Sequence, residues 1–250
     1  MKSLIISFSM YSIIPMPHFE WTKDNMKYSL ALLPIVGIII GVIWHFMYIV
    51  LQSFTHVFSS TMLLLIPIII SGGIHLDGLI DTSDAIFSYG DTQKKLEILK
   101  DPRTGAFGVI GAVVYFLCLF SIYYEMLQVG KFIEFMPFTF MISRSIGALC
   151  LLSVPKAKTT GLGATFSNSS DITISKIILA CFVVFGFIKY IGFNVTICIL
   201  IMSILSIFLI SFIFYIKKCF GGINGDLTGF IITTVEMLVP LTIVIGGKFL

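Results

Sequence analysis

Residues 194–216 read NVTICILIMSILSIFLISFIFYI, a run of 23 residues without a charged side chain. A helix needs about 20 predominantly apolar residues to cross the hydrocarbon core of a bilayer, so this run is long enough to span one. The rest of the chain has the same character, because 57% of its 250 residues are hydrophobic and only 12% are charged. A soluble domain carries about 25% charged residues. The sequence therefore predicts an integral membrane protein whose surroundings are lipid.

Apolar stretches of similar length predict about seven transmembrane helices in a single all-α membrane domain, residues 1–250. The expected spans are 28–51, 58–74, 105–124, 132–154, 174–192, 194–216 and 228–249. Residues 1–17 are apolar but contain Pro15 and Pro17, so we expect them to lie at the interface or to re-enter rather than to span. No small-residue cleavage site precedes those prolines, and a cleaved signal peptide is not expected.

Basic residues divide unequally between the two sides of the expected spans. One side holds the N-terminal segment and the loops near 75–104, 155–173 and 217–227, and it carries most of the Lys and Arg residues. Cytoplasmic loops carry the excess of these residues, so we expect a polytopic protein of the cell membrane with its N-terminus and these loops in the cytoplasm. The net charge is only +3, and no basic block suited to nucleic acid is present.

Acidic residues concentrate in one of these loops. Six of the thirteen lie between positions 77 and 101, and the first three occur in Gly72-Gly73-Ile74-His75-Leu76-Asp77-Gly78-Leu79-Ile80-Asp81-Thr82-Ser83-Asp84. On a helix, at about 100° per residue, Asp77, Asp81 and Asp84 fall within an arc of about 60°. Carboxylates on one face repel one another, which destabilises the helix. A bound divalent cation such as Mg²⁺ or Mn²⁺ removes this repulsion. We predict a metal site here; the alternative is a solvated loop that happens to be acidic.

The residues after this cluster suit a phosphorylated substrate. Glu97, Lys100, Asp101 and Arg103 lie between the motif 72–84 and the next expected span. Lys and Arg neutralise charge on phosphate oxygens, and glycines at a helix start, as in Gly105-Ala106-Phe107-Gly108, let backbone N–H groups approach an anion. Lys94 and Lys95 are interpreted as ordinary positive-inside residues. Helical spacing turns His75 away from the three aspartates, and the roles of general base and of a partner that orients a metal ligand both stay open for it.

Two further loops on the same side have a similar composition. Pro155-Lys156-Ala157-Lys158-Thr159-Thr160-Gly161-Leu162-Gly163 combines cations, hydroxyls and glycines, and it is equally consistent with an anion site and with a positive-inside loop. Gly221-Gly222-Ile223-Asn224-Gly225-Asp226 stands directly before the last span. Asp226 either completes the metal site from a distant part of the chain or caps the final helix.

Two charges lie well inside expected spans, Arg144 and Glu236. A charged side chain inside a membrane is costly, and such residues are usually paired or functional. Arg144 and Glu236 therefore either form a structural ion pair, or Arg144 contacts a phosphate of the substrate.

The first acidic motif, residues 72–84, and the stretch Leu96-Glu97-Ile98-Leu99-Lys100-Asp101-Pro102-Arg103-Thr104-Gly105-Ala106-Phe107-Gly108 closely resemble the cobalamin synthase family, the adenosylcobinamide-GDP ribazoletransferases. The resemblance continues, in order, through 15–17, 34–37, 161–163 and 221–226. It implies a multi-span enzyme that requires Mg²⁺. Such an enzyme joins adenosylcobinamide-GDP to α-ribazole, or to α-ribazole 5′-phosphate, and yields adenosylcobalamin, or its phosphate, and GMP. This is the last assembly step of the cobalamin nucleotide loop.

This chemistry assigns roles to the motif residues. The ribazole 5′ oxygen would attack the phosphorus next to cobinamide, a reaction that depends on positioning and on cations. The expected metal ligands are Asp77, Asp81 and Asp84, with Asp226 as a possible fourth, and the same three aspartates and His75 are the catalytic candidates. The expected substrate-binding residues are Glu97, Lys100, Asp101, Arg103, Arg144, Lys158 and Asn224.

Two other functions compete with this one. A CDP-alcohol phosphotransferase also uses clustered aspartates beside a membrane, but its further aspartates after an Asp-Gly and an Ala-Arg are not found here. An ion-coupled transporter would place acidic residues near mid-membrane in broken helices, whereas here they concentrate just past the end of a span.

Overall fold

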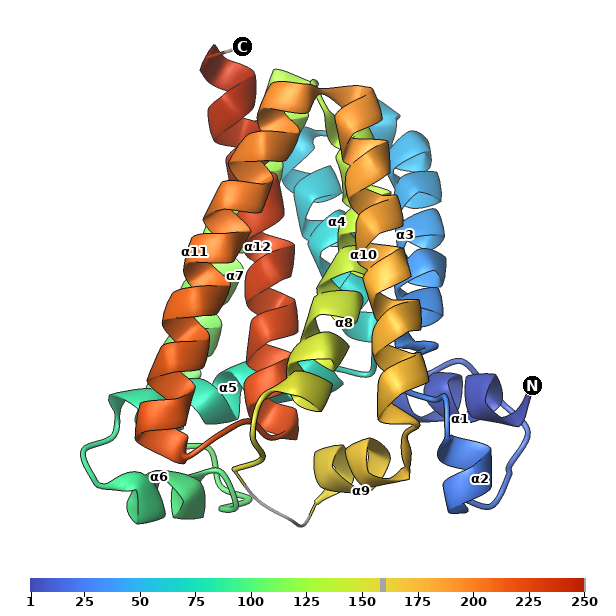
Figure 1. Cartoon of the computed structure of the whole chain (residues 1–250). Helices are drawn as coiled ribbons and strands as arrows, with labels where there is room; N and C mark the ends of the chain where they lie inside the picture. The colour runs from blue at the N-terminus through green and yellow to red at the C-terminus, as the bar shows by residue number, and fades with distance from the viewer. Residues whose placement is uncertain (158–160, 250) are drawn as a thin grey trace.

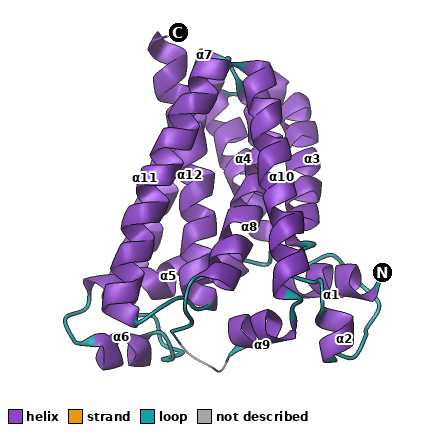
Figure 2. Ribbon diagram, in the orientation of Figure 1, coloured by secondary structure: helices purple, strands orange, loops and turns teal. Residues whose placement is uncertain are grey.

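The computed structural model describes residues 1–157 and 161–249, and their regular structure is helical. The elements are α1 (Lys2–Tyr11), α2 (Lys23–Met26), α3 (Leu33–Val50), η1 (Leu51–Ser53), α4 (His56–Ile70), α5 (Ile74–Phe87), α6 (Thr92–Ile98), α7 (Ala106–Val129), η2 (Ile133–Phe135), α8 (Met136–Ser153), α9 (Leu162–Ser169), α10 (Ile172–Phe193), α11 (Val195–Phe220) and α12 (Gly225–Phe249). The long helices stand side by side as a bundle, while α1, α2, α5, α6 and α9 gather at one end of it, here called the α5 end (Figures 1 and 2).

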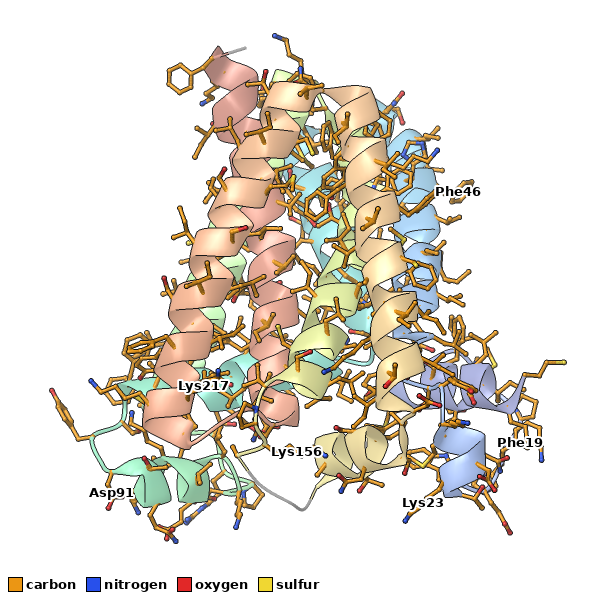
Figure 3. The ribbon with its side chains drawn as sticks, in the orientation of Figure 1. Phe19, Lys23, Phe46, Asp91, Lys156 and Lys217 are labelled. Carbon is orange, nitrogen blue, oxygen red and sulfur yellow. The ribbon has the colours of Figure 1, made fainter. Side chains whose placement is uncertain are left out.

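Membrane-spanning helices are recognisable by length and composition. In the described part of the chain, six helical segments qualify by themselves: Leu33–Ser53, Ala106–Val129, Ile133–Ser153, Ile172–Phe193, Val195–Phe220 and Gly225–Phe249. The pair α4 and α5 qualifies only as a unit and is bent by 94°, which raises the count to seven. The all-α polytopic fold with about seven spans is thus confirmed. Side chains such as Phe46, which is 62% exposed, project outward from the bundle toward lipid (Figure 3).

The bend between α4 and α5 comes from two consecutive glycines. Gly72 and Gly73 have φ values of 64° and 75°, in the left-handed region that glycine adopts without strain. Their N–H groups donate to the carbonyls of Ile69, at 3.0 Å, and Ile68, at 2.9 Å, which closes the last turn of α4. Because of this bend, α5 runs across the α5 end instead of continuing α4 along the bundle (Figure 1).

The bend can be tested with Gly73→Ala. A methyl group at Gly73 would meet nothing within 4 Å, so the substitution isolates the cost of left-handed backbone, about 1–2 kcal/mol. Gly192→Ala is the matched control, because Gly192 also has open space around it but no left-handed φ. We expect thermal unfolding in detergent to occur at a lower temperature for Gly73→Ala and not for Gly192→Ala. Equal shifts in the two variants would contradict the explanation of the bend.

Glycines also let helices approach closely where the bundle is tightest. A side chain on Gly37 or Gly41 of α3 would collide with the backbone of α8, as expected for small residues four apart at a membrane helix crossing. A Cβ on Gly78 of α5 would lie 2.7 Å from the carbonyl oxygen of Asp226 in α12. The central helices α8 and α12 are largely buried, whereas α10 and α11 mostly face outward.

The N-terminal segment lies at the α5 end rather than in the bundle (Figure 1). The backbone N–H of Ile13 donates to the carbonyl of Ile70 at 2.8 Å, which fastens the segment to the end of α4. Helix α1 packs against α3 and α2. The expectation that residues 1–17 do not span the membrane is confirmed.

Candidate active site

A pocket of about 450 Å³ lies at the α5 end and brings together residues from distant parts of the chain. Helix α5 contributes His75 and Asp77, the segment after α6 contributes Lys100, and the start of α12 contributes Asn224 and Asp226. All five belong to motifs that the sequence singled out. The acidic helix and the glycine-rich loop before the last span therefore form one site.

The crossing of α5 and α12 determines how Asp77 and Asp226 meet. Gly78 and Gly229 face each other there, and a Cβ on Gly229 would lie 3.0 Å from the carbonyl oxygen of His75. At Gly78, where a Cβ would lie 2.7 Å from the Asp226 carbonyl oxygen, a larger residue would force the backbones apart, and at Gly229 the neighbouring backbone would have to shift by a few tenths of an ångström. The glycines thus hold the carboxylate-bearing ends of the two helices together.

Asn224 organises the start of α12. Its Oδ1 accepts a hydrogen bond from the Leu227 N–H at 2.9 Å, so Asn224 fills the N-cap role that the sequence left open for Asp226. Its Nδ2 donates to Oδ2 of Asp226 at 2.8 Å and thereby orients that carboxylate. Asn224 thus both caps α12 and positions a carboxyl group that lines the pocket.

The segments 155–157 and 221–226, from the two glycine-containing loops, lie against each other beside the pocket. The Ala157 N–H donates to the Ile223 carbonyl at 2.9 Å, and the Ile223 N–H donates to the Pro155 carbonyl at 2.8 Å. Gly163, which lines the pocket, packs against Gly225 so closely that a Cβ on it would lie 2.9 Å from the Gly225 nitrogen. Lys158 lies outside the described residues.

The three aspartates of α5 are used differently, although the predicted helix is present. Asp84 accepts hydrogen bonds from the N–H groups of Gly105, at 2.9 Å, and Gly108, at 3.2 Å, so the anion at the start of α7 is a carboxylate of this chain. Asp77 lines the pocket, whereas Asp81 and Asp84 do not. Nowhere in the ranges 1–157 and 161–249 do three His, Cys, Asp or Glu side chains gather as a metal-binding group. The cluster expected from helical spacing is thus not preassembled in these ranges, and Asp84 is engaged by the start of α7.

Among the predicted substrate-binding residues Glu97, Lys100, Asp101 and Arg103, only Lys100 lines the pocket. The Arg103 guanidinium donates to both carboxylate oxygens of Asp101, at 2.9 and 2.8 Å, and this pairing lowers the pKa of Asp101 to about 2. Arg103 itself is 87% exposed. Glu97 lies on the outer face of α6, 3.9 Å from the Lys94 ammonium. The structure gives these three residues partners at the surface instead of a place in the pocket.

Arg144 and Glu236 form a buried ion pair between α8 and α12. Arg144 also donates to the Phe140 carbonyl at 3.1 Å, and the Ser143 hydroxyl donates to Glu236 at 2.8 Å. Arg144 is 1% exposed and does not line the pocket, so of the two interpretations the structure favours the structural pair. His75 stands between the two regions, because it lines both the pocket and a small cavity shared with Arg144 and Glu236.

Lys95 has a structural role that the sequence did not reveal. Its ammonium donates to the carbonyls of Ala85, Ile86 and Ser88 at 2.8, 2.9 and 3.2 Å, which are groups at the C-terminal end of α5. A cation at a helix C-terminus satisfies free carbonyls and interacts favourably with the helix dipole. The only sequence signal was a lysine shortly after an expected helix.

Replacing Lys95 by Met should therefore lower the stability of the protein. Three hydrogen bonds from one charged donor contribute about 1.5–3 kcal/mol when they act as a unit. The neighbouring Lys94→Met is the control, because Lys94 is 61% exposed and makes only a long surface pair. We expect the midpoint of unfolding in detergent to fall for Lys95→Met alone. The role assigned to Lys95 is wrong if the two variants unfold alike.

Comparison with known proteins adds an independent line of evidence. The chain matches the family described as Cobalamin-5-phosphate synthase over residues 3–244. It is 35% identical, over 95% of its own length and 94% of the relative's, to the "Adenosylcobinamide-GDP ribazoletransferase" of Clostridium botulinum strain Alaska E43. The protein of the same name from Lachnoclostridium phytofermentans is 36% identical over 98% of this chain and 94% of the relative. No solved structure matches the chain.

Proposed function

The chain belongs to the cobalamin-5-phosphate synthase family, and we propose that the pocket between α5 and α12 is its active site. The enzyme is an adenosylcobinamide-GDP ribazoletransferase, which performs the final assembly step of the cobalamin nucleotide loop. Its substrates are adenosylcobinamide-GDP and α-ribazole or the 5′-phosphate of α-ribazole. The phosphotransferase and transporter alternatives are set aside by this membership.

The observation that carries the proposal is the meeting of Asp77, Lys100 and Asp226 in one pocket. Carboxylates and a cation from three separate segments converge where a diphosphate could bind. Phosphoryl transfer requires little covalent help from a protein, but it requires positioning and charge neutralisation. Lys100 supplies a positive charge for the diphosphate oxygens.

We propose that Asp77 and Asp226 hold Mg²⁺ in this pocket. The ion prefers oxygen ligands and is commonly bound by one or two carboxylates together with water and substrate phosphates, rather than by a complete cage of side chains. A pocket lined by two carboxylates fits that pattern better than three aspartates on one helix. Bound Mg²⁺ would neutralise charge on the phosphoryl oxygens. Asp81, one turn after Asp77, remains a candidate for a supporting role.

In the reaction, a ribose hydroxyl oxygen of α-ribazole forms a bond to the phosphorus next to cobinamide, and the bond from that phosphorus to the GMP oxygen breaks. The expected 5′ oxygen is not the nucleophile, because α-ribazole 5′-phosphate carries at that position a phosphate that its product retains. Lys100 and the backbone of the glycine-rich loop at Gly225 would position the diphosphate for in-line attack. A hydroxyl nucleophile must lose a proton, and the carboxylate of Asp77 and the imidazole of His75 are the pocket groups able to accept it.

The α5 end is proposed to face the cytoplasm, with the protein in the cell membrane. Support comes from the charges: Lys23, Lys156 and Lys217 lie at this end of the bundle (Figure 3), as do most of the other basic residues. Lys and Arg are enriched on the cytoplasmic side of membrane proteins. The N-terminus lies at the same end, and the C-terminus lies at the other (Figure 1).

The proposal is tested by GMP release from the purified protein in detergent. Release should require both substrates, stop when a chelator removes divalent cations, and resume when Mg²⁺ or Mn²⁺ is returned. Release that continues unchanged in the chelator would contradict the Mg²⁺ proposal. A folded protein that forms no GMP from both substrates with Mg²⁺ would contradict the assignment of the reaction.

A further inference from the structure

The lining of the pocket has two chemically different parts. Asp77 and Lys100, with Asn224 and Asp226, form an exposed or half-exposed polar mouth. A second part of the lining, here called the apolar wall, comes from α1, from the segment that leads into α3 and from α8, and its residues are Met10, Tyr11, Leu30, Leu33, Ala148 and Leu151. Apart from the Tyr11 hydroxyl and the weakly accepting sulfur of Met10, no side chain of the apolar wall can form a hydrogen bond.

The apolar wall is the more deeply buried part of the lining. Leu30, Leu33 and Ala148 are at most 2% exposed and support the wall from behind, whereas half-buried Met10 offers surface to the pocket. The Tyr11 ring stacks on His75, with centroids 6.0 Å apart and planes at 19°, and it packs against Phe166 at 5.8 Å. These contacts fix the Tyr11 ring, so the apolar wall has a defined shape before any substrate enters.

We propose that the apolar wall binds the base of α-ribazole; this inference rests on the pocket being the active site. The substrates carry three large groups: guanine, a corrin ring edged with amides, and a dimethylbenzimidazole. Guanine and the amides would lose hydrogen bonds to water in an apolar enclosure, and each unpaired polar group is costly there. The dimethylbenzimidazole has no polar substituent on its outer edge, and its burial is favourable.

Size leads to the same assignment. A volume of about 450 Å³ is within the range of pockets that enclose small ligands, and a nucleoside is of that class. The corrinoid is far larger than a nucleoside and must remain at the mouth. With its base against the apolar wall, α-ribazole would direct its ribose hydroxyls toward Asp77, Lys100 and Asp226, where the phosphorus of the other substrate would be held.

The test compares two nucleoside substrates, one with dimethylbenzimidazole and one with unsubstituted benzimidazole. The measured quantity is kcat/KM for the first divided by kcat/KM for the second. The ratio of their kcat/KM values depends only on active enzyme, so partial loss of folded protein does not alter it. We expect Met10→Ala and Leu151→Ala each to lower the ratio by about tenfold, because a lost methyl contact in an apolar pocket is worth roughly that factor or more. Lys100→Met is the control; it should lower both kcat/KM values and leave their ratio unchanged.

Several outcomes would decide the inference. An unchanged ratio in active Met10→Ala would overturn it, and half-buried Met10 decides the matter if Leu151→Ala does not fold. A raised KM for adenosylcobinamide-GDP with an unchanged nucleoside ratio would assign the apolar wall to the corrinoid and also overturn it. If instead Lys100→Met is as active as the wild type, the proposed function of the pocket fails, whatever the ratio.

Discussion

Replacing Asp77 by Asn is expected to slow GMP release by about 100- to 1000-fold, the loss typical when one preorganised electrostatic contact to a transition state is removed. The side chain keeps its shape but loses the charge that would hold Mg²⁺. Asp226→Asn should have a similar effect, because Asp226 lines the same pocket from α12. Initial rates of GMP release by purified variants in detergent measure both effects.

Asp91→Asn is the control for these two variants. Asp91 caps α6 by accepting a hydrogen bond from the Lys94 N–H at 2.9 Å, and it does not line the pocket. Its replacement should leave the rate close to that of the wild type. Near-normal rates for folded Asp77→Asn and Asp226→Asn would show that these carboxylates are not part of the active site.

Arg144→Met should produce the largest loss of stability. It leaves the Glu236 carboxylate buried without its guanidinium partner, and breaking a buried ion pair in this way costs about 3–5 kcal/mol. Adding Glu236→Gln removes the unpaired charge, so the double variant should recover much of that loss. Thermal unfolding in detergent of the single and double variants provides the comparison.

The same pair of variants separates the two roles considered for Arg144. A structural residue affects GMP release only through folding, so the double variant should release GMP at a rate near that of the wild type. A residue that contacts the substrate phosphate would leave the double variant folded but slow. The second outcome would contradict the structural interpretation of the pair.

Local features of the sequence predicted much of the fold. The uncharged run 194–216 and the other apolar stretches are sufficient to locate the spans, because crossing a bilayer depends on length and composition. The spacing of apolar and acidic residues in 74–87 predicted that α5 is a helix. The sequence did not predict the 94° angle between α4 and α5, although it shows Gly72 and Gly73, because a glycine pair permits a bend without specifying its direction.

The site was harder to predict where it depends on tertiary contacts. Asp84 shares a helix face with Asp77, but its partners Gly105 and Gly108 are more than 20 residues further along the chain, and no periodicity reveals them. Tyr11 reaches the pocket only because the N-terminal segment folds back to the end of α4. The Arg144–Glu236 pair could be anticipated, because charges are so rare inside the spans that each needs a partner.

The most direct test of joint metal binding by Asp77 and Asp226 is the binding of Mn²⁺ to the purified protein, followed by electron paramagnetic resonance. Wild-type protein and Asp91→Asn should bind Mn²⁺ alike, and Asp77→Asn and Asp226→Asn should each bind it at least about tenfold more weakly. If both pocket variants instead bind Mn²⁺ as tightly as the wild type, the metal lies elsewhere and the proposed site is wrong.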